Sequence, residues 1–132
     1  MAGWKKHMTV AASVAGGVNF LWQLLKVYKG GEPPRSFWAA LARIDYLEVA
    51  AFSAGGAVLG ALPDILEPAT NPNHRALFHS LSCAGAVIYG AFGKHSDEWR
   101  PDDRFGARAI ALSYLSHLYL DAGTRKGLPL IC

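Results

Sequence analysis

The sequence predicts an all-α protein, a compact and membrane-associated bundle of about four main helices. Three observations support this fold class. Ala and Leu dominate the apolar segments without the strict alternation typical of strands. The hydrophobic fraction is 52% and the charged fraction 17%, so the chain is more apolar and less charged than an average soluble domain. Glycine falls largely inside the apolar segments, where small residues favour close packing of membrane helices.

Four apolar segments are expected to be helices, at about residues 7–27, 45–62, 75–93 and 104–121. Their uncharged stretches are 18, 15, 18 and 12 residues long, against about 20 for a full membrane span. Four full spans and a compact bundle sunk in or attached to a bilayer therefore both remain open. The 132 residues show no break in composition, which predicts a single helical domain over 1–132.

The segments between the expected helices indicate which helix ends lie together. Phe37 and Trp38 follow a Gly- and Pro-containing stretch and predict a short surface helix at a membrane interface. The charged stretch 94–104 is expected to be a solvated loop. If the helices run up and down, the start of the first, the end of the second, the start of the third and the end of the fourth share one end of the bundle.

Candidate metal ligands occur in three segments that meet at that end. His and carboxylate side chains are the usual ligands of Zn²⁺ and related ions. His117 and Asp121 are four residues apart and lie on one face of a helix. Asp64 and Glu67 are expected on a turn at the end of the second helix, next to Pro63 and Pro68.

His74 and His79 are five residues apart, about 140° around an ideal helix, so one of them must lie at a helix start. Asn71-Pro72-Asn73 is a turn signal that favours a helix beginning near His74. His7 is expected to join the candidate ligands from the N-terminal end, while His95 falls at the opposite end.

The basic residues divide between the two ends, and the end away from the candidate ligands has more. The excess predicts that this end lies in the cytoplasm and the ligands on the outer side of an inner membrane. The net charge of +3 suits an anionic membrane surface but is too diffuse to indicate nucleic-acid binding. The ligand end holds Lys5, Lys6, Arg75, Arg125 and Lys126, and the other end holds Lys26, Lys29, Arg35, Arg43, Lys94, Arg100, Arg104 and Arg108.

Three motifs carry a family resemblance: Leu62-Pro63-Asp64, then His74-Arg75 with His79-Ser80-Leu81, then Ser116-His117-Leu118 with Asp121 and Gly127-Leu128-Pro129-Leu130. In this order they resemble the YdjM-like family of bacterial inner-membrane, metal-dependent hydrolases. The resemblance covers 60–81 and 114–130. It implies a mostly helical membrane protein with a divalent metal, and it suggests Asp64, His74, His79, His117 and Asp121 as functional positions. Glu67 departs from the pattern, where Asp is expected.

Two functions of different classes follow from these patterns. The first is a membrane-associated hydrolase that uses water activated by a divalent metal, on a phosphoester or similar substrate near the lipid headgroups. One or two Zn²⁺ ions are expected, with Mn²⁺ as the alternative. Glu67 or Asp64 is the candidate base, and Arg75 either stabilises negative charge on the substrate or forms an ion pair. The second is a non-enzymatic membrane protein with a structural metal site that recruits a partner.

Overall fold

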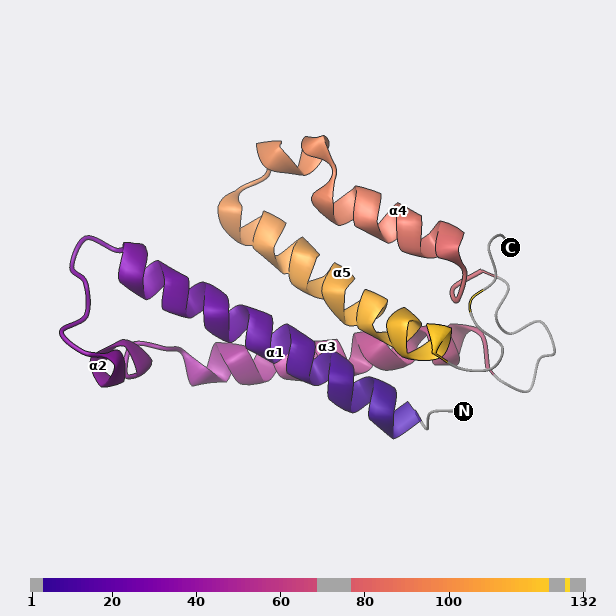
Figure 1. The fold of residues 1–132 in the computed structure, drawn as a ribbon, viewed down its shortest axis with the longest axis horizontal. Helices are drawn as coiled ribbons and strands as arrows, with labels where there is room; N and C mark the ends of the chain where they lie inside the picture. The colour runs from indigo at the N-terminus through magenta and orange to yellow at the C-terminus, as the bar shows by residue number, and fades with distance from the viewer. Residues whose placement is uncertain (1–3, 69–76, 124–127, 129–132) are drawn as a thin grey trace.

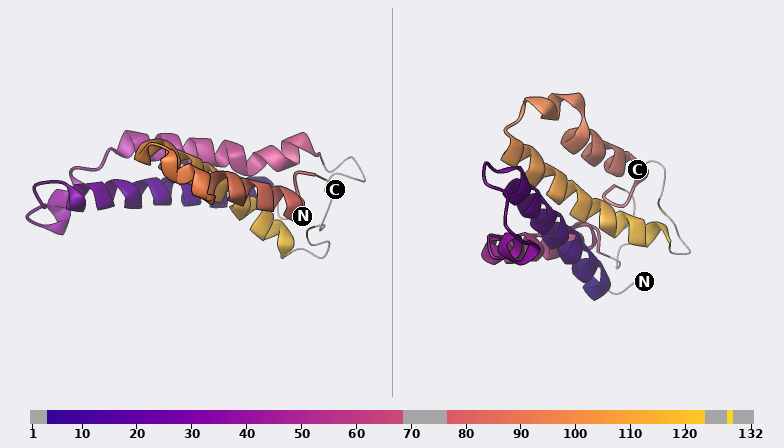
Figure 2. Two further views of the ribbon diagram at one scale, coloured as in Figure 1. Left: turned by 90° about the horizontal axis from the view of Figure 1, so that it is seen from above. Right: turned by 60° about the vertical axis from the view of Figure 1, so that its left-hand side comes forward.

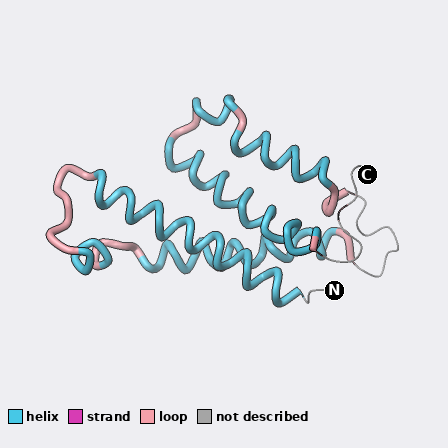
Figure 3. Tube along the Cα trace, in the orientation of Figure 1, coloured by secondary structure: helices cyan, strands magenta, loops and turns pink. Residues whose placement is uncertain are grey.

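The structure, a computed structural model, describes residues 4–68, 77–123 and 128. The described residues form helices and connecting turns without a strand (Figures 1 and 3). The all-α prediction is confirmed. The elements are α1 (Trp4–Lys29), α2 (Phe37–Leu41), α3 (Tyr46–Leu66), α4 (Leu81–Phe92), the 3₁₀ helix η1 (Lys94–Glu98) and α5 (Pro101–Ala122).

Helices α1 and α3 pack side by side in opposite directions and form the centre of the bundle (Figures 1 and 2). Helix α5 packs against both of them, and α4 packs against α5 on the outside. The start of α1, the end of α3, the start of α4 and the end of α5 all lie at one end, on the right of Figure 1. The gathering of these four helix ends, expected from an up-and-down arrangement, is confirmed.

Glycines allow α1 and α3 to approach closely. A Cβ atom built on Gly60 would lie 2.3 Å from the Cβ of Ala11, and one built on Gly56 would lie 2.5 Å from the Cβ of Ala15. These distances are shorter than any van der Waals contact, so a side chain at either position would push the helices apart. Ala11 and Ala15 are themselves buried in the contact.

Buried polar side chains fix the other end of the α1–α3 pair. The Asn19 amide donates to the Glu48 carboxylate at 2.9 Å, and the Gln23 Oε1 accepts from the backbone N–H of Asp45 at 2.7 Å. Asp45 caps α3, because its carboxylate accepts from the N–H groups of Leu47 and Glu48. These contacts set where α3 begins and hold its first turn against α1.

Helix α4 begins later than the sequence predicts. We expected a helix from about residue 75, but residues 77–80 form a turn and α4 starts at Leu81. The Ser80 hydroxyl accepts from the backbone N–H of Cys83 and caps the helix. His79 therefore lies in the turn before α4. The predicted helix start near His74 lies outside the described residues.

Two other boundaries differ from the expected ones. Helix α3 continues through Pro63 to Leu66, because the lost proline N–H breaks only one helical hydrogen bond while the carbonyl of Pro63 still accepts from Glu67 N–H. The stretch 94–104 is mostly helical, containing η1 and the first turn of α5.

Two helices in the described part of the chain, α1 and α3, are long and apolar enough to cross a membrane. Only 28% of the most apolar stretch of α1 and 22% of that of α3 are buried inside the protein, so most of each stretch faces outward. The 12-residue α4 is about 18 Å long and too short for a span. The third apolar segment is therefore not the near-complete span that its uncharged length suggested.

Candidate metal centre

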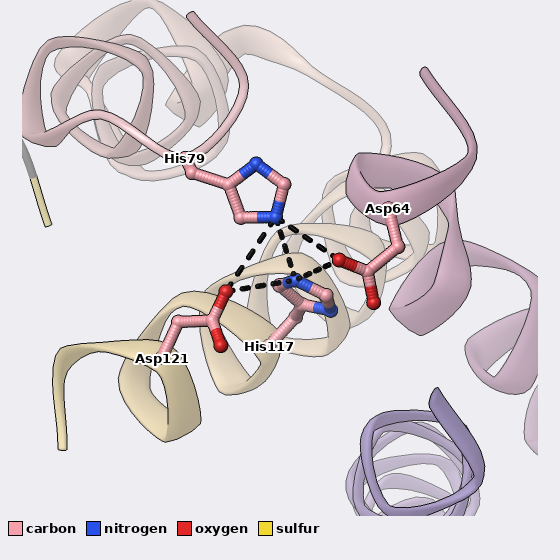
Figure 4. A group of neighbouring side chains, drawn as sticks. All are labelled: Asp64, His79, His117 and Asp121. Carbon is pink, nitrogen blue, oxygen red and sulfur yellow. Dashed lines mark hydrogen bonds and ion pairs between the residues drawn. The ribbon is translucent and has the colours of Figure 1, made fainter. Parts of the chain in front are cut away.

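Four side chains from three segments converge at the end of the bundle (Figure 4). Asp64 lies in the last turn of α3, His79 in the turn before α4, and His117 and Asp121 in the last two turns of α5. One possible ligand atom from each lies within 4.8 Å of the other three. The convergence of helix ends thus brings these predicted ligands to one point.

Five of the six separations between these atoms are close to the edges of a small coordination polyhedron. His79 Nε2 lies 3.2 Å from His117 Nε2, 3.3 Å from Asp64 Oδ1 and 3.5 Å from Asp121 Oδ2. His117 Nε2 lies 3.8 Å from Asp64 Oδ1 and 3.5 Å from Asp121 Oδ2. A tetrahedral zinc ion with bonds of about 2.0–2.1 Å separates its ligands by about 3.4 Å. The four atoms could therefore hold one ion with little movement.

The Gly60 carbonyl sets the protonation of His117. His117 Nδ1 lies 2.6 Å from Gly60 O, and because a carbonyl can only accept, Nδ1 carries the hydrogen. In the neutral ring this leaves the lone pair on Nε2, which faces the other three ligands. Burial alone would lower the pKa of His117, but Asp121, the Gly60 carbonyl and the nearby charge of Asp64 raise that pKa, because they favour the ring with a hydrogen on Nε2 as well as on Nδ1.

Glu67 acts on His79 in the same way. Its carboxylate accepts from the backbone N–H groups of Leu77 and Phe78 at 2.8 and 3.0 Å and faces His79 Nδ1 at 3.1 Å. Although burial would raise the pKa of Glu67, these hydrogen bonds lower it and keep the carboxylate ionised. His79 Nδ1 therefore donates, and the lone pair of His79 also falls on Nε2.

All four converging atoms are consequently acceptors when both imidazoles are neutral. The side chains of His79, His117 and Asp121 are 0–5% exposed, and that of Asp64 is 33% exposed. With both rings neutral, two carboxylates and two lone pairs would face one another and repel, and a divalent cation would stabilise all of them together. One divalent metal ion could be bound by all four atoms at once.

Tyr114 fixes the turn that carries His79. Its hydroxyl, on α5, donates to the backbone carbonyl of Phe78, the residue before His79, and lies 3.1 Å from Cys83 Sγ. Burial and the neighbouring thiol raise the pKa of Tyr114, so the hydroxyl keeps its proton for this bond. Helix α5 thus supplies two ligands and also anchors the turn that supplies a third.

His7 lies beside the four ligands without joining them. Its ring contacts that of His117 in a tilted arrangement with a centroid distance of 4.0 Å, and its Nε2 lies 3.6 Å from Asp121 Oδ1, the oxygen other than the one that faces His79. The Nδ1 atom of His7 is buried and has no hydrogen-bond partner among the described residues. The structure therefore places His7 next to a ligand, and its own predicted role as a ligand stays a prediction.

The remaining predicted site residues divide into two groups. Glu67 is present at the site but behind His79, where its three hydrogen bonds favour a positioning role over the catalytic role that we predicted. His74 and Arg75 lie outside the described residues.

Sequence reasoning missed two contributors, the Gly60 carbonyl and the Tyr114 hydroxyl. Tyr114 could have been found, because it lies one turn before His117 on the same helix face.

Asp64 is the most exposed of the four side chains, so the group meets solvent at Asp64. Such a site can hold a divalent metal and present it to a molecule at this end of the bundle. Comparisons of this chain with protein-family models, curated proteins and solved structures find no match.

Proposed function

We propose that this protein is a metal-dependent hydrolase of the bacterial inner membrane that acts on a phosphoester near the lipid headgroups. The observation that carries the proposal is the convergence of Asp64, His79, His117 and Asp121 with separations close to those around one zinc ion. Zn²⁺ is the proposed metal and Mn²⁺ the alternative, because two imidazoles and two carboxylates suit both. A second ion stays part of the proposal through His7 and His74.

The helix lengths support a position at the membrane surface. Helix α3 has 21 residues and is about 31 Å long, close to the thickness of the hydrocarbon core of a bilayer. Asp64 lies in its last turn, so a membrane-spanning α3 would hold the metal centre near the headgroups. The larger number of basic residues at the other end favours a cytoplasmic location for that end. The resemblance to the YdjM-like family agrees with this assignment.

Each residue has a proposed task. A divalent ion at this site would polarise both a water molecule and a phosphoryl oxygen, the chemistry of metal-dependent hydrolases. Asp64 binds the ion at its open side, where the substrate enters. Glu67 and the Gly60 carbonyl orient His79 and His117. Arg75 keeps its proposed role of stabilising negative charge on the substrate.

A second candidate function rests on the number of ligands. Structural zinc sites are closed by four protein ligands, whereas catalytic sites have three and an open position for water. The four atoms at this centre therefore also favour a non-enzymatic membrane protein whose metal stabilises the fold for a partner. The exposed side chain of Asp64 separates the two candidates, because a carboxylate at the rim can be displaced by water or substrate.

The first test is the metal content of the purified protein by elemental mass spectrometry. We expect one or two Zn²⁺ or Mn²⁺ per chain, and loss of the metal in His117→Ala with retained helical content by circular dichroism. His95→Ala is the matched control, because His95 lies at the other end of the bundle and should leave the metal in place. No metal after reconstitution, or a full load in His117→Ala, would contradict the proposal.

Cobalt substitution then separates the catalytic from the structural candidate. At a catalytic site, inorganic phosphate added to the Co²⁺ protein displaces water or Asp64 and changes the visible absorption spectrum of the ion. At a closed structural site the spectrum stays unchanged. Hydrolysis of 4-nitrophenyl phosphate esters by the Zn²⁺ protein, lost in His117→Ala, would complete the case for the hydrolase.

A further inference from the structure

A groove runs between the first two turns of α1 and the last three turns of α3, and a ligand of the metal centre lies in its wall. Its volume is about 420 Å³, within the range of small-molecule sites. It lies at the same end of the bundle as the candidate metal centre, and Asp64, whose side chain is 33% exposed, belongs to both. The lining residues are Trp4, Met8, Val58, Ala61, Asp64 and Ile65.

The groove is apolar everywhere except at Asp64. Trp4 and Met8 are four residues apart on one face of α1, and Val58, Ala61 and Ile65 share one face of α3. Trp4, Val58 and Ile65 are each more than half exposed, although they are large and apolar. From Val58 to Ile65 the groove follows α3 for about 10 Å. A long apolar lining with one charged residue, Asp64, matches an amphiphile, which has an apolar tail and a polar head.

We propose that this groove binds the hydrocarbon tail of an amphiphilic phosphoester whose head reaches the metal centre beside Asp64. This inference rests on the proposed function and names its substrate class. A nucleotide or a sugar phosphate would need polar partners along the groove, which the lining offers only at Asp64. The groove also lies between α1 and α3, the two helices suited to cross a membrane, so a lipid chain can enter it from the bilayer.

Chain length is the variable that tests the inference. Each methylene that leaves water for an apolar groove tightens binding by about fourfold. The probes are methyl, butyl, octyl and dodecyl 4-nitrophenyl phosphates. In each, water adds to phosphorus, the bond to the 4-nitrophenyl oxygen breaks, and 4-nitrophenolate and a proton are released. We expect kcat/KM to be at least tenfold higher for the octyl than for the methyl ester.

Detergent or lipid also concentrates long-chain esters, so the comparison needs variants. Val58→Trp replaces a small aliphatic side chain by a bulky indole ring at an exposed position in the groove and should reduce the octyl-to-methyl ratio of kcat/KM several-fold. Ile88→Trp on α4 is the matched control, because Ile88 is similarly exposed but does not line the groove. It should keep the wild-type ratio, since partitioning into detergent affects all variants equally. Equal ratios in wild type and Val58→Trp would overturn the inference.

Photolabelling tests the groove without turnover. A dodecyl phosphate with a diazirine in its tail should label peptides containing Met8 and Val58, and excess unlabelled dodecyl phosphate should compete, whereas dodecanol should compete much less. Labelling spread evenly over the exposed apolar surface, or equal competition by dodecanol, would mean ordinary lipid contact and would overturn the inference. The proposed function fails separately, through absence of metal or of hydrolysis of every ester, including the methyl ester.

Discussion

At the scale of single residues, one backbone carbonyl and one carboxylate orient the two histidines of the candidate metal centre. The Gly60 carbonyl and the Glu67 carboxylate each accept a hydrogen bond from the Nδ1–H of one histidine, so both rings present Nε2 to the same point. This arrangement fixes the tautomer and the orientation of each ring before an ion binds, which reduces the entropy lost on binding. The selection of the tautomer therefore depends on partners outside the ligand set.

Replacement of Glu67 tests this dependence. In Glu67→Gln one acceptor oxygen becomes an NH₂ group that faces a donor, either His79 Nδ1–H or a backbone N–H of the turn. We expect metal affinity to fall by about 10- to 100-fold, as for other residues that orient metal ligands. Competition with a chelator of known affinity would measure the change. Glu98→Gln, at an exposed position in η1, is the control, and an equal loss of affinity there would contradict the positioning role.

At the scale of helices, the close contact of α1 with α3 also builds the site. Gly60 takes part in the helix contact and in the site. Because it has no side chain, Ala11 can pack against it, and its carbonyl orients His117. A change in the spacing of the two helices would therefore move the Gly60 carbonyl relative to α5. The stability of the α1–α3 pair and the metal affinity are expected to change together.

Gly60→Ala tests this coupling, with Gly55→Ala as the matched control. The new methyl at residue 60 would meet Ala11 and the His7 carbonyl, whereas at residue 55 it would meet no atom within 4 Å. We expect Gly60→Ala to destabilise the protein by about 1–3 kcal/mol through overpacking and to weaken metal binding. Gly55→Ala should leave stability equal or raise it by up to about 1 kcal/mol. Thermal unfolding with and without Zn²⁺ measures both, and equal melting temperatures for the two variants would contradict the contact.

The start of α4 shows where local signals were insufficient. Asn71-Pro72-Asn73 predicted a helix beginning near residue 74, but among the described residues the helix begins after Ser80. The backbone N–H groups of Leu77 and Phe78 donate to the Glu67 carboxylate, and the Phe78 carbonyl accepts from the Tyr114 hydroxyl. These backbone groups are therefore used in tertiary contacts and not in a helix. Glu67 is 10 residues away from Leu77 and Tyr114 is 36 away from Phe78. A local pattern contains no information about such partners.

At the scale of the whole molecule, α1 and α3 are long and apolar enough to cross a membrane, and their orientation would decide which compartment the candidate metal centre faces. Exposed aromatic side chains occur at both ends of the α1–α3 pair, as in the interfacial belts of membrane proteins. Trp4 is the first residue of α1, at the end with the candidate metal centre, and Tyr28, Trp38 and Tyr46 belong to the end of α1, to α2 and to the start of α3, at the other end. If α1 and α3 span the bilayer, the metal centre faces one compartment only.

Cysteine labelling tests the orientation in intact cells. With Cys83 and Cys132 replaced by Ser, Lys5→Cys reports on the metal end and Glu32→Cys on the other end. Since basic residues are more numerous at the second end, we expect a membrane-impermeant maleimide to label Lys5→Cys from outside, and Glu32→Cys only after permeabilisation. The reverse pattern would place the metal centre in the cytoplasm. Labelling of both from outside would exclude an inner-membrane span of α1.

The sequence by itself determined the helical class, the approximate position of each main helix and the common end at which the candidate ligands lie. Apolar composition, periodicity and the spacing of His117 and Asp121 depend on local properties of the chain, so they can be read without a structure. Tertiary structure alone decided that Asp64, His79, His117 and Asp121 form the closest group, that His7 lies beside them and that Glu67 lies behind His79. The physical reason is that these relations depend on the spacing of α1, α3 and α5 and on hydrogen bonds between residues distant in sequence.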